Sequence, residues 1–136
     1  MKKQKICIIG DGLTGLTTAL GIAILGIQVD LYLKKKKINK KDIRTTAVSE
    51  SSYQFLKSIL HCSNLNYTWP CKDINLYYEN NDRYLNFLNY KENKIRLMHI
   101  FQNYKLRQNL IKKILINKNI KTINQSINNI DYNENK

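Results

Sequence analysis

The chain has few cysteines, and their placement argues against a protein stabilised by disulfide bonds or by a structural zinc ion. The three cysteines, Cys7, Cys62 and Cys71, stand far apart among 136 residues, and no two of them form a C-x-x-C spacing. An odd number of widely separated thiols supports neither a disulfide framework nor a structural zinc site. We therefore expect a reducing, cytoplasmic setting and no bound metal, with Cys7 as a small apolar residue of a buried strand.

Long hydrophobic runs are also missing. The longest apolar stretch, residues 13–29, is short for a membrane span, contains several threonines and glycines, and follows the charged Asp11. Such a stretch is typical of a buried helix rather than of a signal peptide or a transmembrane segment. The sequence has no internal repeat and no long low-complexity segment, and its length fits one globular domain.

Acidic residues are scarce: 10 Asp and Glu stand against 23 Lys and Arg, for a formal net charge of +13. Such an excess can indicate a nucleic-acid or anionic-membrane partner. Here the basic residues are spread along the chain instead of lining one helix face, which favours a composition bias over a binding surface. The sequence has no nucleic-acid motif and no aromatic stacking platform. A non-enzymatic basic protein that binds nucleic acid or an anionic surface stays open as an alternative.

What the chain does contain is a glycine turn behind an apolar run. Residues 6–9 (ICII) are followed at residues 10–15 by GDGLTG, the G-x-G-x-x-G pattern of dinucleotide-binding proteins, and then by a helix-like stretch. In such a turn the first glycine allows the sharp exit from the strand, the second lets a pyrophosphate approach the backbone, and the third lets helix and strand pack closely. The pattern predicts a pyrophosphate site, with helix amides facing the phosphates, at Gly10, Gly12, Leu13, Thr14 and Gly15.

Asp11 is the unexpected member of this turn. A carboxylate beside a pyrophosphate repels it, because both groups are negatively charged. We therefore expect the Asp11 side chain to point away from the ligand.

The hydrophobic spacing around the turn predicts a βαβ unit over about residues 4–34. Its parts are a strand at residues 5–9, a helix at 13–25 that Gly26 ends, and a strand at 29–33. The expected fold class is α/β: a Rossmann-like dinucleotide-binding domain with a three-layer sheet, a β-hairpin and a later helix. Downstream we expect a charged loop at 34–42, a helix from a Ser49 cap to about 60, a turn at Trp69-Pro70, a hairpin of 74–78 and 84–88 across 79–82, a helix from 102 or 103 to about 116, and a strand at 121–130.

Three stretches together resemble a known family. They are residues 7–17 (CIIGDGLTGLT), residues 42–49 (DIRTTAVS) and residues 103–110 (NYKLRQNL), in the order and rough spacing seen in the FAD-dependent aromatic hydroxylases, or monooxygenases, of ubiquinone biosynthesis. The resemblance covers most of the chain, but only the amino-terminal portion of such an enzyme. It implies that residues 1–136 form a single, partial FAD-binding domain.

The resemblance implies FAD as the cofactor, with NAD(P)H as the electron donor of the complete enzymes. The glycine turn would hold the FAD pyrophosphate, Arg44 would lie near the flavin and the phosphates, and Arg107 would also contact FAD. An arginine suits either place, because its planar fork grips a phosphate or a ring carbonyl with paired hydrogen bonds. The cofactor supplies the redox chemistry, so we expect no catalytic acid or base, and we interpret the isolated His61 and His99 as structural or surface residues.

Two features depart from the family. The second strand ends in DLYLK, so Leu33 or Lys34 stands where an acid would bind the adenosine ribose, and Lys34 could instead bind a 2′-phosphate. NADP binding is therefore the alternative within the same fold. A second Gly-Asp flavin motif and the ring-hydroxylating pocket lie beyond the matched region. We expect the chain alone to be inactive as a hydroxylase, to act with a separate chain or a carboxy-terminal portion, and to be cytoplasmic, with peripheral association with the inner membrane as an option.

Overall fold

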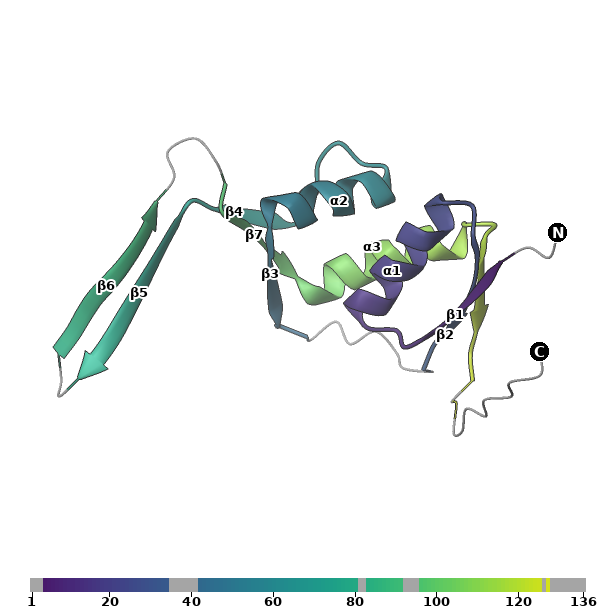
Figure 1. The fold of residues 1–136 in the computed structure, drawn as a ribbon, viewed down its shortest axis with the longest axis horizontal. Helices are drawn as coiled ribbons and strands as arrows, with labels where there is room; N and C mark the ends of the chain where they lie inside the picture. Colours follow the sequence, from purple (N-terminus) through teal and green to yellow (C-terminus); the bar gives the residue numbers. More distant parts are fainter. Residues whose placement is uncertain (1–3, 35–41, 81–82, 92–95, 126, 128–136) are drawn as a thin grey trace. The chain divides into compact units, whose positions relative to one another are not determined.

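The computed structural model describes residues 4–34, 42–80, 83–91, 96–125 and 127 (Figure 1). In chain order its elements are β1 (Lys5–Ile9), α1 (Leu13–Ile24), β2 (Gln28–Tyr32), β3 (Thr45–Ser49), α2 (Glu50–Leu60), β4 (Thr68–Cys71), β5 (Asp73–Asn80), β6 (Arg83–Lys91), β7 (Met98–Gln102), α3 (Asn103–Leu115) and β8 (Ile120–Ile123). The chain divides into two compact units. Unit 1 comprises Met1–Asp42 with Tyr104–Lys136, and unit 2 is Ile43–Asn103.

Unit 1 is built on a parallel three-stranded sheet with the order β1-β2-β8. β1 and β2 pair along their whole length, with Ile9 opposite Tyr32 at the carboxyl end, and β8 continues the sheet beside β2, with Val29 opposite Ile120. α1 connects β1 to β2, and α3 precedes β8. This is the βαβ unit of a Rossmann-like α/β fold, and the prediction from the hydrophobic spacing is confirmed.

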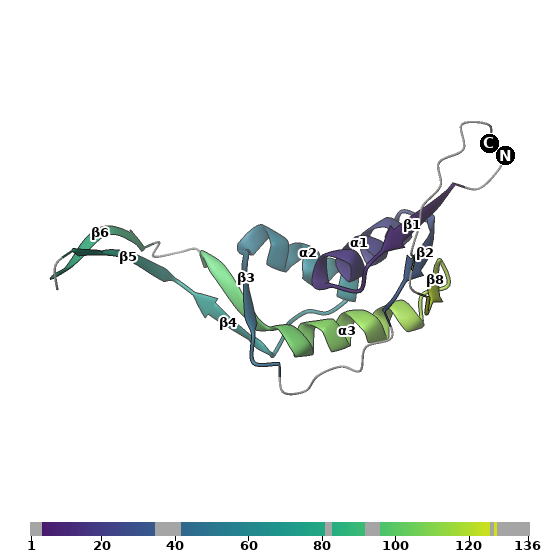
Figure 2. The same ribbon diagram turned by 90° about the horizontal axis from the view of Figure 1, so that it is seen from below.

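Both helices of unit 1 lie on one face of its sheet, as the two ribbon views show (Figures 1 and 2). Side chains alternate between the two faces of a strand, and in β2 the residues Val29 and Leu31 are the buried ones. β8 adds the buried Ile120. The two helices contribute the other buried apolar side chains of unit 1, which are Leu16, Ala19, Leu20, Ala23, Leu106, Leu110 and Ile114. The core of unit 1 therefore lies between one sheet face and two helices.

The opposite face of this sheet carries exposed side chains. Cys7 is exposed, contrary to the expectation of a buried strand residue, because Ile6 and Ile8 take the less exposed positions of the alternation. Ile9 is 53% exposed. The third layer of the expected sheet stays a prediction.

The backbone at the start of α1 packs closely against the backbone just after β1. A Cβ added to Gly15 would overlap the carbonyl oxygen of Gly10 and would lie 3.2 Å from its carbonyl carbon. These are main-chain atoms, which cannot turn aside as a flexible side chain can. Glycine at position 15 is therefore required by the packing of the helix, as the turn pattern predicts.

The other end of α1 is also fixed by a glycine. The helix ends at Ile24 with Leu25 as its C-cap, and Gly26 follows with a φ of 78°, a left-handed conformation that suits glycine. Asn119, in the loop before β8, donates through Nδ2 to the carbonyl of Ala23 over 3.1 Å, and 96 residues separate these two partners. The loop before β8 is thus tied to the end of α1.

Unit 2 contains an antiparallel sheet with the order β3-β7-β4, against which α2 packs. α2 begins where the sequence predicts: the hydroxyl of Ser49 accepts a hydrogen bond from the amide of Ser52 and caps the helix. Leu60 is its last residue, and His61 follows with a φ of 51°. The predicted bounds of α2 are confirmed.

The strands of this sheet include one correction. Trp69-Pro70, interpreted from sequence as a turn, lies in β4, with Pro70 opposite His99. β4 is an edge strand of the sheet, and there the missing amide of proline can face away from the ladder. The sequence pattern does not predict β3 and β7, because each runs directly into a helix without a turn signal between the two elements.

β5 and β6 form the predicted hairpin, and residues 81–82 of its expected turn lie outside the described part of the chain. A β-bulge interrupts the pairing between Leu76 and Tyr77. Next to the bulge, Ile74 lies opposite Tyr90 and Leu76 opposite Leu88, so apolar residues share one face. Most of them are exposed, and an exposed apolar face on a two-stranded sheet favours association.

The later elements differ modestly from expectation. α3 runs over Asn103–Leu115, one residue short of the predicted end. β8 covers Ile120–Ile123, whereas the expected strand spans residues 121–130, of which 126 and 128–130 lie outside the described part of the chain. The expected charged loop at residues 34–42 lies largely outside the described residues.

His99 and Glu50 form a partly buried polar contact in unit 2. Nε2 of His99, a residue with a 1% exposed side chain, lies 2.7 Å from Oε2 of Glu50, and the His99 ring stacks on Tyr53 with 3.6 Å between ring centroids. Hydrogen bonds with Gln54 and with His99 lower the pKa of Glu50 below its ordinary value of 4.5. His99 thus joins β7 to the start of α2, in keeping with its interpretation as a structural residue.

We expect Gly15→Ala to destabilise unit 1 by about 1–3 kcal/mol, because the new methyl group overlaps the Gly10 carbonyl. Hydrogen exchange of α1 amides measures the effect. Gly12→Ala is the matched control: its Cβ meets no atom within 4 Å, and the cost there should stay below about 1 kcal/mol. Equal exchange rates in the two variants would contradict the packing role of Gly15.

We expect Glu50→Gln to destabilise unit 2 at neutral pH by about 1 kcal/mol, a value discounted for the one-third exposure of Glu50. Because folding lowers the pKa of Glu50, its charge stabilises the protein above pH 4.5, and this contribution is lost as the pH falls below that value. Fluorescence of Trp69, the single tryptophan, reports urea unfolding of unit 2. The control is Asp73→Asn, and a Glu50→Gln deficit that persists at acid pH would refute the assignment.

Candidate functional site

The glycine turn lies at the carboxyl edge of the parallel sheet of unit 1. It follows β1, and the amide of Gly10 donates to the carbonyl of Tyr32, the last residue of β2, over 3.1 Å. Gly10 has a φ of 127°, which a residue with a side chain rarely adopts. Ligands of open α/β sheets bind outside this carboxyl edge. The turn therefore stands where this type of fold binds its ligands.

The first turn of α1 presents backbone amides without a side-chain cap. Gly12 is the N-cap residue, and a Cβ added to it would meet no atom within 4 Å. The first turn of this 12-residue helix contains no acidic residue. The amides of Leu13, Thr14 and Gly15 have no acceptor within the helix, and the helix dipole adds positive potential there. This end of α1 can hold an anion.

Asp11 and Arg107 form an ion pair beside the turn. Nη2 of Arg107 donates to Oδ2 of Asp11 over 2.6 Å, and Nε donates to the main-chain carbonyl of Asp11 over 3.2 Å. The side chains of Asp11 and Arg107 are 20% and 22% exposed. The structure thus brings Arg107, a predicted cofactor-binding residue of α3, into contact with Asp11 of the glycine turn. The carboxylate of Asp11 faces the Arg107 guanidinium.

The other predicted residues lie as follows. Lys34 is exposed and comes two residues after the end of β2, at the same sheet edge as Gly10. Arg44 precedes β3 in unit 2, where its carbonyl accepts a hydrogen bond from the amide of Asn103, and its contact with a cofactor stays a prediction. Asp30 lies in the middle of β2 and binds Nζ of Lys5 over 2.7 Å, so its carboxylate is engaged away from the end of the strand.

The pairing of Asp11 with Arg107 is the feature that sequence reasoning missed. The two residues are 96 positions apart, and no local sequence pattern links them. A signal was available: a carboxylate inside a phosphate-binding turn needs a cation to neutralise it. An arginine in a stretch that also resembles a cofactor-binding helix is the natural candidate for that cation.

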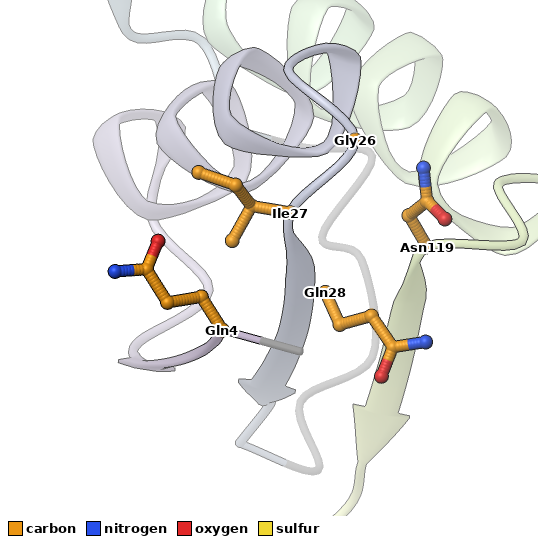
Figure 3. Close-up of a pocket in the computed structure, with 5 residues that line it drawn as sticks. All are labelled: Gln4, Gly26, Ile27, Gln28 and Asn119. Carbon is orange, nitrogen blue, oxygen red and sulfur yellow. The ribbon is translucent and has the colours of Figure 1, made fainter. Parts of the chain in front are cut away.

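Other features of the described residues do not enlarge this site. A hollow of about 180 Å³ is lined by Gln4, Gly26, Ile27, Gln28 and Asn119 (Figure 3). It lies at the amino ends of β1, β2 and β8, the edge opposite the glycine turn. In the part of the chain that the structure describes, no group of three or more His, Cys, Asp or Glu side chains could hold a metal ion. None of the described helices combines the length and apolar character needed to cross a bilayer.

Comparisons with known proteins find likeness in structure alone. No protein-family model and no curated protein sequence matches the chain. Among solved structures, the chain is similar to the probable FAD-dependent monooxygenase PqsL from Pseudomonas aeruginosa, with a TM-score of 0.64, 12% identity and coverage of 88% of this chain and 32% of that chain. It is similar to p-nitrophenol 4-monooxygenase PnpA from Pseudomonas putida DLL-E4, with a TM-score of 0.64, 13% identity and coverage of 88% and 32%.

A third solved structure extends the same likeness. It is 2,6-dihydroxypyridine-3-hydroxylase from Arthrobacter nicotinovorans, with a TM-score of 0.59, 15% identity and coverage of 89% of this chain and 29% of that chain. The chain therefore has the fold of a part of these proteins, and it spans about a third of their length. At such low identity the likeness shows the fold alone.

We expect the uncapped start of α1 to bind inorganic pyrophosphate, and Gly12→Ala to weaken that binding about tenfold or more, because its methyl group occupies the open approach. Isothermal titration calorimetry measures the affinity, with sodium chloride of matched ionic strength as the salt control. The circular dichroism spectrum should stay unchanged. Undiminished affinity in a folded Gly12→Ala variant would place the anion elsewhere.

Proposed function

We propose that the chain is the FAD-binding part of a flavin-dependent monooxygenase that hydroxylates an aromatic ring, of the type found in ubiquinone biosynthesis. The observation that carries this proposal is the uncapped α1 N-terminus behind a glycine turn at the carboxyl edge of a parallel sheet. This arrangement suits a dinucleotide pyrophosphate. The fold shared with proteins described as FAD-dependent or ring-hydroxylating supports FAD over other dinucleotides.

The residues of the turn fit this cofactor. The open space at Gly12 gives a phosphate access to the backbone, and the amides of Leu13, Thr14 and Gly15 would donate to it. Arg44 would grip the flavin side or the phosphates with its planar fork. The bound flavin supplies the redox chemistry, and this chain binds and orients it.

The complete activity would need more protein than these residues. The chain spans about a third of the similar monooxygenases, and we propose that a separate chain or a further portion of polypeptide supplies the wall over the flavin ring and the substrate pocket. NAD(P)H would then donate electrons to the completed enzyme. Such a division assigns cofactor binding to this chain and substrate choice to the rest.

Lys34 favours one alternative, an NADP-binding oxidoreductase domain. It stands just beyond β2 and is exposed, close to where an acid would otherwise accept hydrogen bonds from the adenosine ribose. An ammonium group there suits a 2′-phosphate. The FAD-binding and NADP-binding hypotheses differ in which of the two cofactors binds more tightly.

A titration with FAD, NADP⁺ and NAD⁺ separates these readings. We expect FAD to bind with quenching of its fluorescence and to bind more tightly than either nicotinamide cofactor. A preference for NADP⁺ that Lys34→Ala abolishes would support the alternative. A colourless protein that binds none of the three would refute both.

We also expect the chain alone to give no substrate-dependent oxidation of NADPH, even with FAD bound. The assay follows NADPH absorbance with a panel of phenols and hydroxypyridines. Free FAD without protein is the control for background oxidation. Hydroxylated product formed by the chain alone would overturn the proposed division of the activity.

A further inference from the structure

We propose that Asp11 and Arg107 form a positioning pair that prepares the glycine turn for a pyrophosphate, and that Arg107 acts through Asp11 instead of serving as a ligand of the phosphates. This inference rests on the proposed function of the turn as a dinucleotide site. It concerns how this site is held ready. The pair lies wholly within unit 1.

The first support is the way the guanidinium group of Arg107 is occupied. Its Nε and Nη2 atoms both donate to Asp11, one to the main-chain carbonyl and one to the carboxylate. These two atoms form one of the edges with which an arginine grips a phosphate with paired hydrogen bonds. That edge is taken by the turn itself, so Arg107 holds Asp11 with the geometry it would otherwise offer to a ligand.

The second support is the backbone of the turn. The turn contains three glycines, the residue type that loses the most conformational entropy when its backbone is fixed. The helix that follows, α1, has no side-chain cap. The bond from Nε of Arg107 fixes the carbonyl of Asp11 directly between Gly10 and Gly12. A turn that is fixed before the ligand arrives loses less conformational entropy on binding. The contact therefore raises affinity without touching the ligand.

The third support is charge. The carboxylate of Asp11 precedes the anion-binding end of α1 by one N-cap residue, and unpaired it would repel a phosphate. Arg107 lies 2.6 Å from it, and both side chains are mostly shielded from solvent, so the two charges cancel locally. Removal of Arg107 alone would leave this carboxylate exposed to the ligand. Removal of both charges would not.

A double-mutant cycle on FAD affinity tests the pair. The proteins are the wild type, Arg107→Met, Asp11→Asn and the double variant, each checked for folding by circular dichroism. We expect Arg107→Met to weaken FAD binding about tenfold or more when Asp11 is present, and about threefold or less when residue 11 is already changed to asparagine. The same pattern should appear with ADP, which lacks the flavin.

The outcomes separate this inference from the proposed function. An equal loss from Arg107→Met in both backgrounds would mean that Arg107 does not act through the Asp11 carboxylate. It would overturn the positioning pair, while the dinucleotide site would stand. No binding of FAD or ADP by the wild type would overturn the proposed function and the pair together. A tenfold loss that the second substitution relieves supports both.

Chemical rescue supplies a readout that general destabilisation does not move. Guanidinium chloride at low, non-denaturing concentration should restore FAD affinity to Arg107→Ala, because the free ion can occupy the space beside the Asp11 carboxylate. The variant that carries both Asp11→Asn and Arg107→Ala is expected to bind FAD nearly as well as the wild type, and guanidinium should leave its affinity unchanged. Sodium chloride is the control. Equal rescue of the two variants would contradict a role that passes through Asp11.

Discussion

The absence of a side chain at Gly15 is the constraint on which unit 1 depends. A Cβ at this position would overlap the Gly10 carbonyl, so only glycine lets the start of α1 lie this close to the end of β1. This close approach allows Leu16, Ala19 and Leu20 to be buried, and the helix covers one face of the sheet. It also sets the place of the free amides relative to the sheet edge. The packing of α1 and the position of the candidate anion site are therefore decided by the same contact.

The two helices that follow strands β1 and β3, α1 and α2, differ in how their N-termini are capped. α2 is capped by Ser49 and carries Glu50 in its first turn, so its own residues satisfy the amides and the positive potential, and Glu50 in turn contacts His99. α1 has a glycine N-cap, no acidic residue in its first turn, and a neighbouring carboxylate that is drawn to Arg107. The start of α2 is capped by the chain's own side chains, whereas the first-turn amides of α1 have no side-chain cap and can bind an external anion.

Sequence reasoning predicted the local part of this fold and little of its long-range pairing. β1, α1, α2 and the hairpin follow from periodicity, from the glycine turn and from the Ser49 cap, because each signal lies within a few residues of its effect. The sheet of unit 2 could not be found this way. β3 and β7 run directly into helices, and Pro70 is compatible with β4 only because that strand lies at an edge. The glycines of the candidate site are predictable, whereas the Asp11–Arg107 pair depends on a helix 96 residues later.

The interrupted course of unit 1 has a consequence for synthesis on the ribosome. Unit 2 is one continuous stretch, Ile43–Asn103, and all its strands have been made before α3 and β8 begin. β1 and β2 can pair early, but the outer edge of β2 waits for Ile120–Ile123, about ninety residues later. At ordinary translation speeds that delay lasts roughly five to twenty seconds. During this interval an unpaired parallel edge and an incomplete apolar layer are accessible to chaperones and to neighbouring nascent chains.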